Sequence, residues 1–495
     1  MKRFHGGFDL PLSVVRTLIG ELAQALPDVG PFRNGLLNSV FDRLKIFAWQ
    51  FHRWCRHVAS KWPSGSDYLM SFPHQIDRSR EPVLMRFERC LLEEEARLPK
   101  GMGTDSPGSS SPRILLVRGG VLTPLSGLGG AFHDLRTALE EGRFGSWSSA
   151  GVEEYDLGEN PSAFSRLWTR WSSHPRSVKA TIENLHREQA LNLVLVSDQE
   201  QAHLVPKTSA VPVVVYVHDF FHLFPSTVTL SGQIVEVGEQ SPTLVRKRDL
   251  RRLLKGLHRA DAFICNTEAT ASVCREHFPN TPLYRIPYAL DMASYAPPQP
   301  LPRPPEPLAN AACHLLVVGS HDPRKRLAFL MEVLAGLDEA VASDINVHHI
   351  GGDASPAGHP SATTLAAQHG VNWHHVGSNI SDDVLNAYRW NCEALLFPSA
   401  AEGFGYPPVE SMAAGQPVLA SDRPAHNELM PENTCLPAED MTAWRNAIVE
   451  VHRAWKAREG AARIPSVELM KHVSFLAPDR FYRDMAKAWD EISSS

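Results

Sequence analysis

The sequence lacks long hydrophobic runs, because no stretch reaches the roughly eighteen consecutive apolar residues of a membrane-spanning helix. Its seven cysteines are scattered and form no C-x-x-C pair, which argues against a disulfide framework or a zinc site and favours reduced thiols. The formal net charge of −6 gives no general signal for nucleic-acid binding. The N-terminal residues make a poor secretory signal, since Asp9 interrupts their apolar pattern. We therefore expect a cytoplasmic protein with no nucleic-acid partner.

The chain is long enough for more than one hydrophobic core. Apolar residues make up 43% of it and charged residues 21%, as in globular proteins. A chain of 495 residues predicts two or three domains. Stretches rich in Gly, Ser or Pro mark the boundaries between them. We expect a helical extension at 1–100, a flexible linker at 101–112, an N-terminal domain at 113–295, a proline-rich linker at 296–310, a C-terminal domain at 311–478 and a final helix at 479–495.

Short apolar runs alternate with longer helical stretches in both domains. The predicted strands are 113–118, 192–196, 213–217, 262–265, 283–286, 314–318, 346–350, 372–376, 394–397 and 417–420. Such alternation predicts parallel sheets covered by helices on both faces. The fold class is therefore α/β, with two similar doubly wound lobes and a cleft between them.

Residues 33–61 of the expected extension read as a basic amphipathic helix. Apolar residues recur there at steps of three and four, and six basic residues against one acidic residue give a net charge of +5. Such a helix could lie on an anionic membrane surface. The alternative is that it packs against the body of the protein with a solvated basic face.

The most informative stretch is Leu396–Glu410, LFPSAAEGFGYPPVE. A strand runs into a glycine-containing loop, and two prolines then stand where a helix begins, with that helix expected over Ser411–Gly415. Gly405 permits close backbone approach, and a helix start presents N–H groups to an anion. Carboxylates would repel a phosphate, so Glu402 and Glu410 should hold hydroxyl groups while cations come from elsewhere. The pattern suggests a nucleotide sugar; the alternative is a surface loop whose acids are solvated.

This run closely resembles the Glu-x7-Glu signature of the retaining glycosyltransferases of family 4 (group 1). The resemblance rests on Glu402–Gly405, Pro407, Glu410, Met412–Ala413 and Gly415. It implies the GT-B fold, in which two Rossmann-like domains face a cleft and the C-terminal helix crosses back to the N-terminal domain. It also implies transfer of a hexose from a nucleotide-diphosphate sugar to an acceptor hydroxyl with retention of configuration. By this pattern Glu402 contacts the donor sugar and Glu410 the ribose.

Other segments match the same family. Arg324 and Lys325 follow the strand at 314–318, and the resemblance implies that they neutralise the donor diphosphate. One departure is Ser320, which stands where some members have an arginine. His218 follows the strand at 213–217, beyond the carboxyl end where ligands of open parallel sheets bind, and the resemblance implies a contact with the donor sugar.

Backbone groups complete the expected donor site. Gly129 and Gly130 precede a helix expected to begin near Ala131, and by position they match the glycine loop that faces the diphosphate. The amides near Gly403, Phe404, Gly405 and Tyr406 are expected to serve the same leaving group. No Asp-x-Asp occurs in the sequence, so we expect no catalytic metal and no cofactor.

Several readings stay open from sequence alone. A GT-B scaffold that binds nucleotide sugars without transferring them, and a phosphorylase or sugar-phosphate synthase on the same fold, are the alternatives to a transferase. The sequence does not contain the glycine fingerprint that a dinucleotide-dependent oxidoreductase requires, which argues against that class of enzyme. The resemblance favours mannose or glucose, with GDP-mannose ahead of UDP-glucose, in envelope polysaccharide or glycolipid assembly. The acceptor is a saccharide or a lipid-linked group, and the protein is cytoplasmic or peripheral on the inner membrane face.

Overall fold

The structure is a computed structural model that describes residues 111–120, 127–155, 162–230, 232–299, 301–302, 304–354, 360–378 and 380–494. The chain divides into two units, residues 1–104 and 105–495, and the described residues belong to the second. The helical extension predicted at 1–100, with its basic helix at 33–61, lies outside the described residues. So does the linker at 101–112 except for its last two residues.

The N-terminal lobe is built on a parallel sheet with the strand order β2-β1-β3-β4-β7-β8. Its strands are β1 (Arg113–Val117), β2 (Ser148–Glu153), β3 (Leu193–Val196), β4 (Val213–Val217), β7 (Ala262–Cys265) and β8 (Leu283–Arg285). The residues of β3, β4 and β7 are buried throughout, as expected for strands covered on both faces. The helical segments are α5 (Gly127–Glu140), α6 (Ala163–Trp168), the π-helix η3 (Thr169–Ser173), α7 (His174–Arg187), η4 (Gln199–Leu204), α8 (Leu244–Leu257) and α9 (Glu268–His277).

The C-terminal lobe has a five-stranded parallel sheet with the order β11-β10-β9-β12-β13, which is the Rossmann order 3-2-1-4-5. Its strands are β9 (Cys313–Val318), β10 (Ile345–Ile350), β11 (Trp373–Gly377), β12 (Ala394–Phe397) and β13 (Val418–Ala420). The helical segments are η6 (Pro323–Lys325), α11 (Leu327–Ala335), α12 (Glu339–Ala342), α13 (Ala362–Gln368), α14 (Asp382–Asn391), α15 (Tyr406–Ala413), α16 (Pro424–Leu429), α17 (Met441–Lys456), α18 (Val467–His472) and η7 (Val473–Leu476). The predicted α/β class with two Rossmann-like lobes is confirmed.

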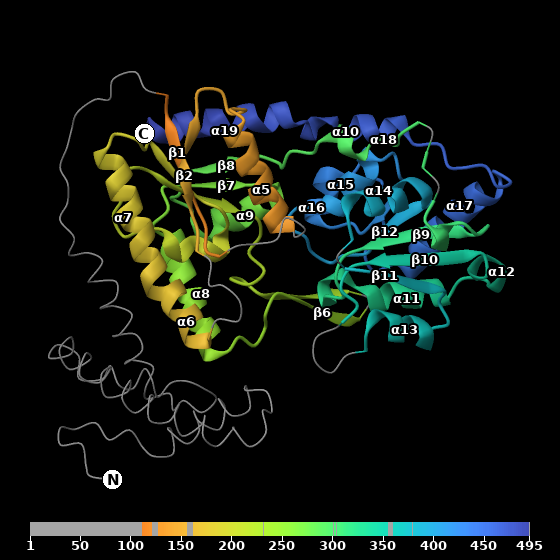
Figure 1. The fold of residues 1–495 in the computed structure, drawn as a ribbon. Coiled ribbons are helices and arrows are strands. Elements are labelled where there is room, and N and C mark those ends of the chain that lie inside the picture. The colour runs from red at the N-terminus through yellow and green to blue at the C-terminus, as the bar shows by residue number, and fades with distance from the viewer. Residues whose placement is uncertain are drawn as a thin grey trace, which may run out of the picture. The chain divides into compact units, whose positions relative to one another are not determined.

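Two segments join the lobes. The first runs from β8 through α10 (Met292–Tyr295) and η5 (Glu306–Leu308) to β9. The second is the last helix, α19 (Pro478–Ser493), whose Trp489 packs against Phe144 and Trp147 of the N-terminal lobe. Figure 1 shows α19 beside β1 and α5. The first connection is bonded to the start of the second, because the Leu290 N–H donates at 2.8 Å to the carbonyl of Leu476, the last residue of η7 just before α19.

The N-terminal lobe also sends a hairpin to the other lobe. Strands β5 (Ser226–Leu230) and β6 (Gln233–Val237) are antiparallel, and β6 lies against η6. Leu230 and Val235 pack with Ala400 and Ala438 of the C-terminal lobe. The sequence analysis missed this hairpin and the strand β2, because neither has the apolar run of a buried strand.

The helix start expected at Pro407 and Pro408 agrees with α15, which begins at Tyr406 because Gly405 (φ +118°) caps it and the two prolines fit its first turn. The span expected for that helix, Ser411–Gly415, differs from the observed one, since α15 ends at Ala413. The helix expected from Ala131 is α5, which begins at Gly127.

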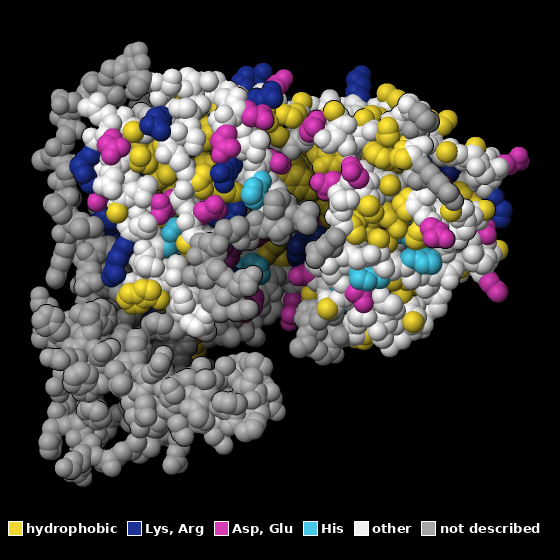
Figure 2. Space-filling model, viewed as in Figure 1, with side chains coloured by type: hydrophobic (Ala, Val, Ile, Leu, Met, Phe, Trp, Pro, Cys, Tyr) yellow, Lys and Arg dark blue, Asp and Glu magenta, His cyan; other side chains and the backbone are white. Residues whose placement is uncertain are grey.

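Figure 2 shows acidic and basic side chains mixed over the viewed face of the described residues, as on an ordinary globular surface.

Candidate functional site

The predicted cations and the first acid of the motif meet at one crevice of the C-terminal sheet. The strand order reverses between β9 and β12, and ligands of doubly wound sheets bind beyond the carboxyl ends of strands at such a reversal. Arg324 and Lys325 belong to the segment that follows β9, and Glu402 belongs to the loop that follows β12. The topology therefore brings together residues that are 77 and 78 positions apart in the sequence.

Glu402 forms the centre of a buried ionic cluster. Its carboxylate accepts hydrogen bonds from Arg324 Nη1 at 2.7 Å, Lys325 Nζ at 2.5 Å and Ser399 Oγ at 2.6 Å. Its side chain is only 9% exposed. Burial by itself raises the pKa of Glu402, but the two cations and these hydrogen bonds outweigh burial and lower the pKa to about 2. The carboxylate is therefore ionised at every physiological pH.

The two cations are affected differently by the same cluster. Burial lowers the pKa of Lys325, and the attraction of Glu402 offsets only part of that effect. Burial also acts on Arg324, but Glu402 and Asp322 outweigh it and raise the pKa of the guanidinium. Each cation keeps further N–H donors beyond those that Glu402 accepts. Arg324 and Lys325 can therefore bind an anion, and the Glu402 carboxylate can then accept hydrogen bonds from hydroxyl groups instead.

A buried arginine that the sequence analysis missed fixes this segment. Arg326 has a left-handed backbone (φ 54°) that ends the turn of η6 before α11 begins. Its guanidinium lies 4.0 Å from the Phe329 ring and donates to the Ala438 carbonyl at 2.8 Å. A left-handed arginine carries no sequence signal, because the usual marker of such a position is glycine or asparagine.

The glycine-containing loop touches the N-terminal lobe. A Cβ atom on Gly403 would lie 2.3 Å from the His218 carbonyl oxygen, so no side chain fits there. The Thr267 hydroxyl also donates to the Gly403 carbonyl at 2.8 Å. Next to it, the rings of Phe404 and Tyr406 pack on Tyr288, with centroids 4.9 and 5.0 Å apart. The motif therefore forms the contact between the lobes at this crevice.

His218 lies in this contact with both ring nitrogens bonded inside the protein. Its Nε2–H donates to the Ser197 carbonyl at 2.8 Å, so Nδ1 accepts from the Tyr288 hydroxyl. Burial lowers the pKa of His218 to about 4, which leaves the ring neutral. A contact between His218 and a donor sugar would require one of these bonds to break, and the role implied by the family stays a prediction.

Glu410 stands on α15 and is bonded by two residues that the sequence analysis did not single out. Arg389 Nη2 donates to one carboxylate oxygen, and the Tyr295 hydroxyl donates to the other at 3.2 Å. The side chain of Arg389 is only 1% exposed. Each oxygen of a carboxylate accepts more than one hydrogen bond, so ribose hydroxyls fit the remaining positions. The expected ribose contact stays a prediction.

Gly129 and Gly130 lie inside the first turn of α5. The first turn of a helix offers backbone N–H groups and a positive dipole end to an anion. Their expected contact with the diphosphate stays a prediction, and residues 121–126 before the helix lie outside the described residues.

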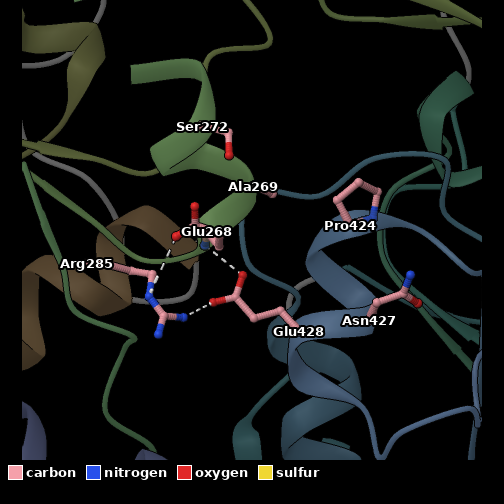
Figure 3. A pocket seen from close by; sticks show the side chains of 7 residues that line it. All are labelled: Glu268, Ala269, Ser272, Arg285, Pro424, Asn427 and Glu428. Atoms are coloured by element: carbon pink, nitrogen blue, oxygen red, sulfur yellow. Dashed lines mark hydrogen bonds and ion pairs between the residues drawn. The ribbon is translucent and has the colours of Figure 1, made fainter. Parts of the chain in front are cut away.

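Two cavities among the described residues differ in size and in their relation to this crevice. The cavity lined by Lys325, Gly319 and Ser399 has a volume of about 10 Å³, which is the size of one water site. The larger one, about 490 Å³, lies between α9, β8 and α16 and contains none of the predicted site residues (Figure 3). There Glu428 accepts from Arg285 Nη1 at 2.5 Å and from the Glu268 N–H at 2.6 Å. Around this second cavity, Glu428 of the C-terminal lobe therefore bonds two residues of the N-terminal lobe.

The described residues contain neither a group of side chains that could hold a metal ion nor a helix that could cross a membrane. No three of their His, Cys, Asp or Glu side chains form a group that could hold a metal ion. The His pairs at 348/349 and 374/375 instead pack across strands: His348 stacks on His374, and the His349 ring is tilted by 40° against the His375 ring. None of the described helices has the length and apolar character needed to cross a membrane.

Comparisons with known proteins agree with this architecture. Residues 312–453 match the family model of group 1 glycosyl transferases. The O-antigen chain mannosyltransferase of Salmonella typhimurium is 38% identical over 61 residues, which are 12% of this chain and 17% of that protein. The MMP alpha-(1->4)-mannosyltransferase of Mycolicibacterium hassiacum is 32% identical over 110 residues, 21% of this chain and 27% of that protein. The chain thus matches less than a third of the length of either relative.

The fold itself matches solved structures over most of the chain. The sucrose-phosphate synthase of Thermosynechococcus elongatus superposes with a TM-score of 0.56 at 17% identity, covering 77% of this chain and 99% of that one. At this identity the likeness shows the fold, which is GT-B. Residues 312–453 of this chain are a group 1 glycosyltransferase domain, carried on a GT-B fold.

Proposed function

We propose that the protein is a retaining glycosyltransferase that moves a hexose from a nucleotide-diphosphate sugar to an acceptor hydroxyl. The observation that carries the proposal is the cluster of Glu402, Arg324 and Lys325 at the strand reversal of the group 1 domain. It offers two cations to a leaving diphosphate and one ionised acid to sugar hydroxyls. Fixed charges aimed at a leaving group are usually the largest contribution to such catalysis.

Reaction begins, in this proposal, with opening of the contact at Gly403. The cavity beside Lys325 has no room for a nucleotide sugar in the present arrangement. A diphosphate would take the N–H donors that Glu402 now accepts, and the freed carboxylate would accept from the sugar. The bond between the anomeric carbon and the diphosphate oxygen then breaks and its electrons leave with the diphosphate. The acceptor oxygen forms the new bond to the anomeric carbon, and the acceptor's hydroxyl proton passes to the departing diphosphate oxygen. Renewed contact between the lobes excludes water.

Mannose is the favoured hexose, ahead of glucose. Both curated relatives are named as mannosyltransferases, and one acts on an O-antigen chain, which favours polysaccharide or glycolipid assembly. We further propose GDP-mannose as the donor, no metal or cofactor, and a cytoplasmic location with peripheral membrane contact through 33–61. A nucleotide-sugar-binding scaffold without transfer is the alternative that the experiment must exclude.

The test has two stages. Purified protein is first titrated with GDP, UDP and ADP, with and without EDTA, while its melting temperature is measured, because a ligand of the native state raises that temperature. Glu410→Ala should lose the shift, and Glu450→Ala, which removes a carboxylate 67% exposed to solvent, should keep it. The matching mannose and glucose donors are then incubated with acceptor saccharides, and the product is followed by NMR, which also reads the anomeric configuration. A nucleotide shift without any product favours the scaffold, and no shift overturns the proposal.

A further inference from the structure

Glu410 belongs to a closed ring of hydrogen bonds that joins α10, α14 and α15. Arg389 donates from Nη2 to the Glu410 carboxylate and from Nη1 to Asn386 Oδ1 at 2.7 Å. Asn386 Nδ2 donates to the Ser294 carbonyl at 3.0 Å. Tyr295, the next residue, donates from its hydroxyl to the other Glu410 oxygen at 3.2 Å and closes the ring. Each oxygen of the carboxylate therefore has a partner of its own.

Tyr295 brings the connection between the lobes into this ring. It is the last residue of α10, which lies on that connection. Its carbonyl accepts from Trp390 Nε1 at 2.8 Å, and the Arg389 guanidinium lies 5.3 Å from the centre of its ring. Burial, together with the charge of Glu410, raises the pKa of the Tyr295 hydroxyl, which therefore keeps its proton and stays a donor. One side chain of the connection is thus fixed on the C-terminal lobe and aimed at the expected ribose site.

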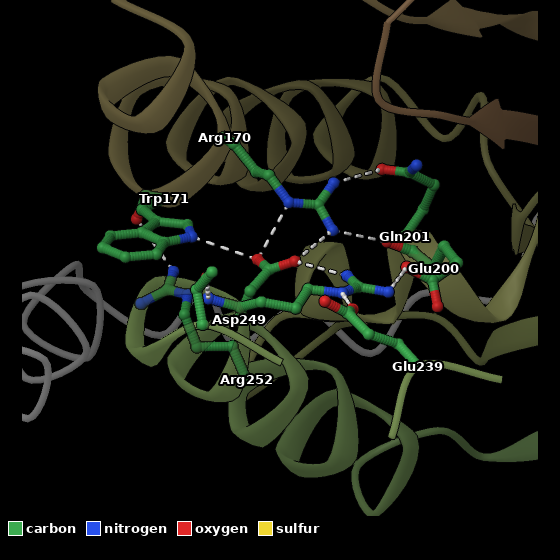
Figure 4. Close-up of polar contacts among 9 residues, drawn as sticks. Arg170, Trp171, Glu200, Gln201, Glu239, Asp249 and Arg252 are labelled. Carbon is green, nitrogen blue, oxygen red and sulfur yellow. Dashed lines mark hydrogen bonds and ion pairs between the residues drawn. The ribbon is translucent and has the colours of Figure 1, made fainter. Parts of the chain in front are cut away.

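The ring uses only half of the acceptor positions of Glu410. A carboxylate has about four such positions, two on each oxygen. All four are used in Asp249 of α8, which accepts from Arg170 Nε and Nη2 at 2.9 Å and from Trp171 and Arg246 at 3.1 Å (Figure 4). Glu410 accepts one bond on each oxygen from the described residues, and its side chain is 17% exposed, against 9% for Asp249. One position on each oxygen of Glu410 thus remains for a ligand.

Two acceptor positions on one carboxylate suit two neighbouring hydroxyl groups, and the 2′- and 3′-hydroxyls of a ribose are such a pair. A carboxylate that rotates freely would offer these positions in no fixed direction. Holding it in one orientation beforehand lowers the cost of binding. The ion pair with Arg389 alone already balances the charge of Glu410. The bond from Tyr295 therefore contributes orientation rather than charge balance.

We propose that Tyr295 is a positioning residue for ribonucleotide selection: its hydroxyl fixes the Glu410 carboxylate so that the two remaining acceptor positions meet the ribose hydroxyls of the donor. Tyr295 acts through Glu410 and not on the reacting atoms. A 2′-deoxynucleotide would leave one acceptor position without its donor, which lowers affinity at a charged acceptor. The inference rests on the function proposed above and adds to it a role for the connection between the lobes.

The experiment uses the full chain and measures binding by calorimetry of GDP, UDP and ADP and of their 2′-deoxy forms. The proteins are the wild type, Tyr295→Phe and the control Tyr284→Phe. Tyr284 of β8 is a matched control, because its hydroxyl is also bonded to a carboxylate, that of Glu491 on α19. We expect the wild type and the control to bind a ribonucleotide about tenfold or more tightly than its 2′-deoxy form. In Tyr295→Phe this ratio should fall to about threefold or less, mainly because the ribonucleotide binds more weakly.

The ratio of the two affinities distinguishes positioning from a merely structural role. General loosening of the site would weaken both forms alike and leave their ratio unchanged. The melting temperature of each protein without ligand shows whether it is folded. If none of the three nucleotides binds the wild type, the proposed function and this inference are both overturned. If a nucleotide binds, then equal affinity of its two forms for the wild type, an unchanged ratio in Tyr295→Phe, or tighter ribonucleotide binding by that variant would each overturn the role of Tyr295 alone.

Discussion

The two strand reversals of this protein lie in parallel sheets of different strand order, and they treat charge in different ways. In the C-terminal crevice one acid and two cations bond one another directly. At the N-terminal reversal Arg118 and Asp198 are buried and attract each other, but they form no direct ion pair. A paired cluster can release its cations to an anionic ligand and re-form afterwards.

Breaking the paired crevice should have the largest effect. Glu402→Gln removes the charge that both cations share, and we expect a loss of transfer rate of about 10²–10³, the range for removing one fixed electrostatic contact in an active site. Single-turnover kinetics measure it. Glu450→Gln is the exposed control. Activity within a few-fold of the wild type would show that Glu402 serves the fold alone.

Isosteric amide substitutions should affect stability with opposite signs in the two crevices. Glu402 has a pKa of about 2, below the usual 4.5, so its ionised form adds stability above pH 4.5 that is lost as pH falls toward 2. Glu402→Gln should therefore destabilise the protein at pH 7, by on the order of 3 kcal/mol, and flatten the acid dependence. Burial raises the pKa of Asp198 above its usual value, so its charged form costs stability at pH 7 that returns as pH falls.

Asp198→Asn should consequently raise the melting temperature at pH 7 by about 2 °C. Urea unfolding of both variants from pH 3 to pH 8 measures the change in the free energy of unfolding that each substitution causes, and so gives the sign of each effect. If Asp198→Asn destabilises as Glu402→Gln does, then Asp198 has a structural partner and the contrast between the crevices is wrong.

Gly403→Ala tests whether the C-terminal crevice works through contact with the N-terminal lobe. The added Cβ would meet the His218 backbone oxygen at 2.3 Å, so the lobes must separate slightly. We expect transfer to fall about tenfold to a hundredfold, as for a small misplacement of reacting groups, while the nucleotide still binds. Gly352→Ala is the control, since its Cβ would meet only the Ser320 side chain at an ordinary 3.7 Å. Equal loss in both variants would argue against the contact.

Ionic strength should produce the smallest effect and sharpen the contrast. Salt screens the attraction between the C-terminal cations and a diphosphate, so nucleotide affinity should fall severalfold between low and physiological salt. Calorimetric titrations at two salt concentrations measure this effect. A nucleotide affinity that does not change with salt would contradict binding by these cations.

Sequence reasoning predicted the features that depend on neighbouring residues. The runs 213–217, 262–265 and 394–397 coincide with β4, β7 and β12, because strands buried on both faces are continuously apolar. The motif around Glu402 was visible because its glycines, prolines and acids stand close together in the chain. Its placement at the strand reversal agrees with the expected GT-B arrangement.

The remaining features depend on contacts between distant residues. Arg389 lies 21 residues before Glu410 on another helix, and Tyr295 lies 115 residues away. Arg118 and Asp198 are single polar residues at the ends of apolar strands, which is common in α/β proteins and carries no spacing signal. The hairpin of β5 and β6 alternates polar and apolar residues weakly, and only its burial against Ala400 gives it a role in the fold.

The bond between Leu290 and Leu476 limits how the two lobes can move. The chain passes between the lobes twice, and this bond ties the two passages side by side where they cross. Two adjacent tethers resist twisting of one lobe against the other and leave bending about the line through them as the easy motion. If the lobes open as proposed, bending about this line would bring a group carried by one lobe back to the same place opposite the other.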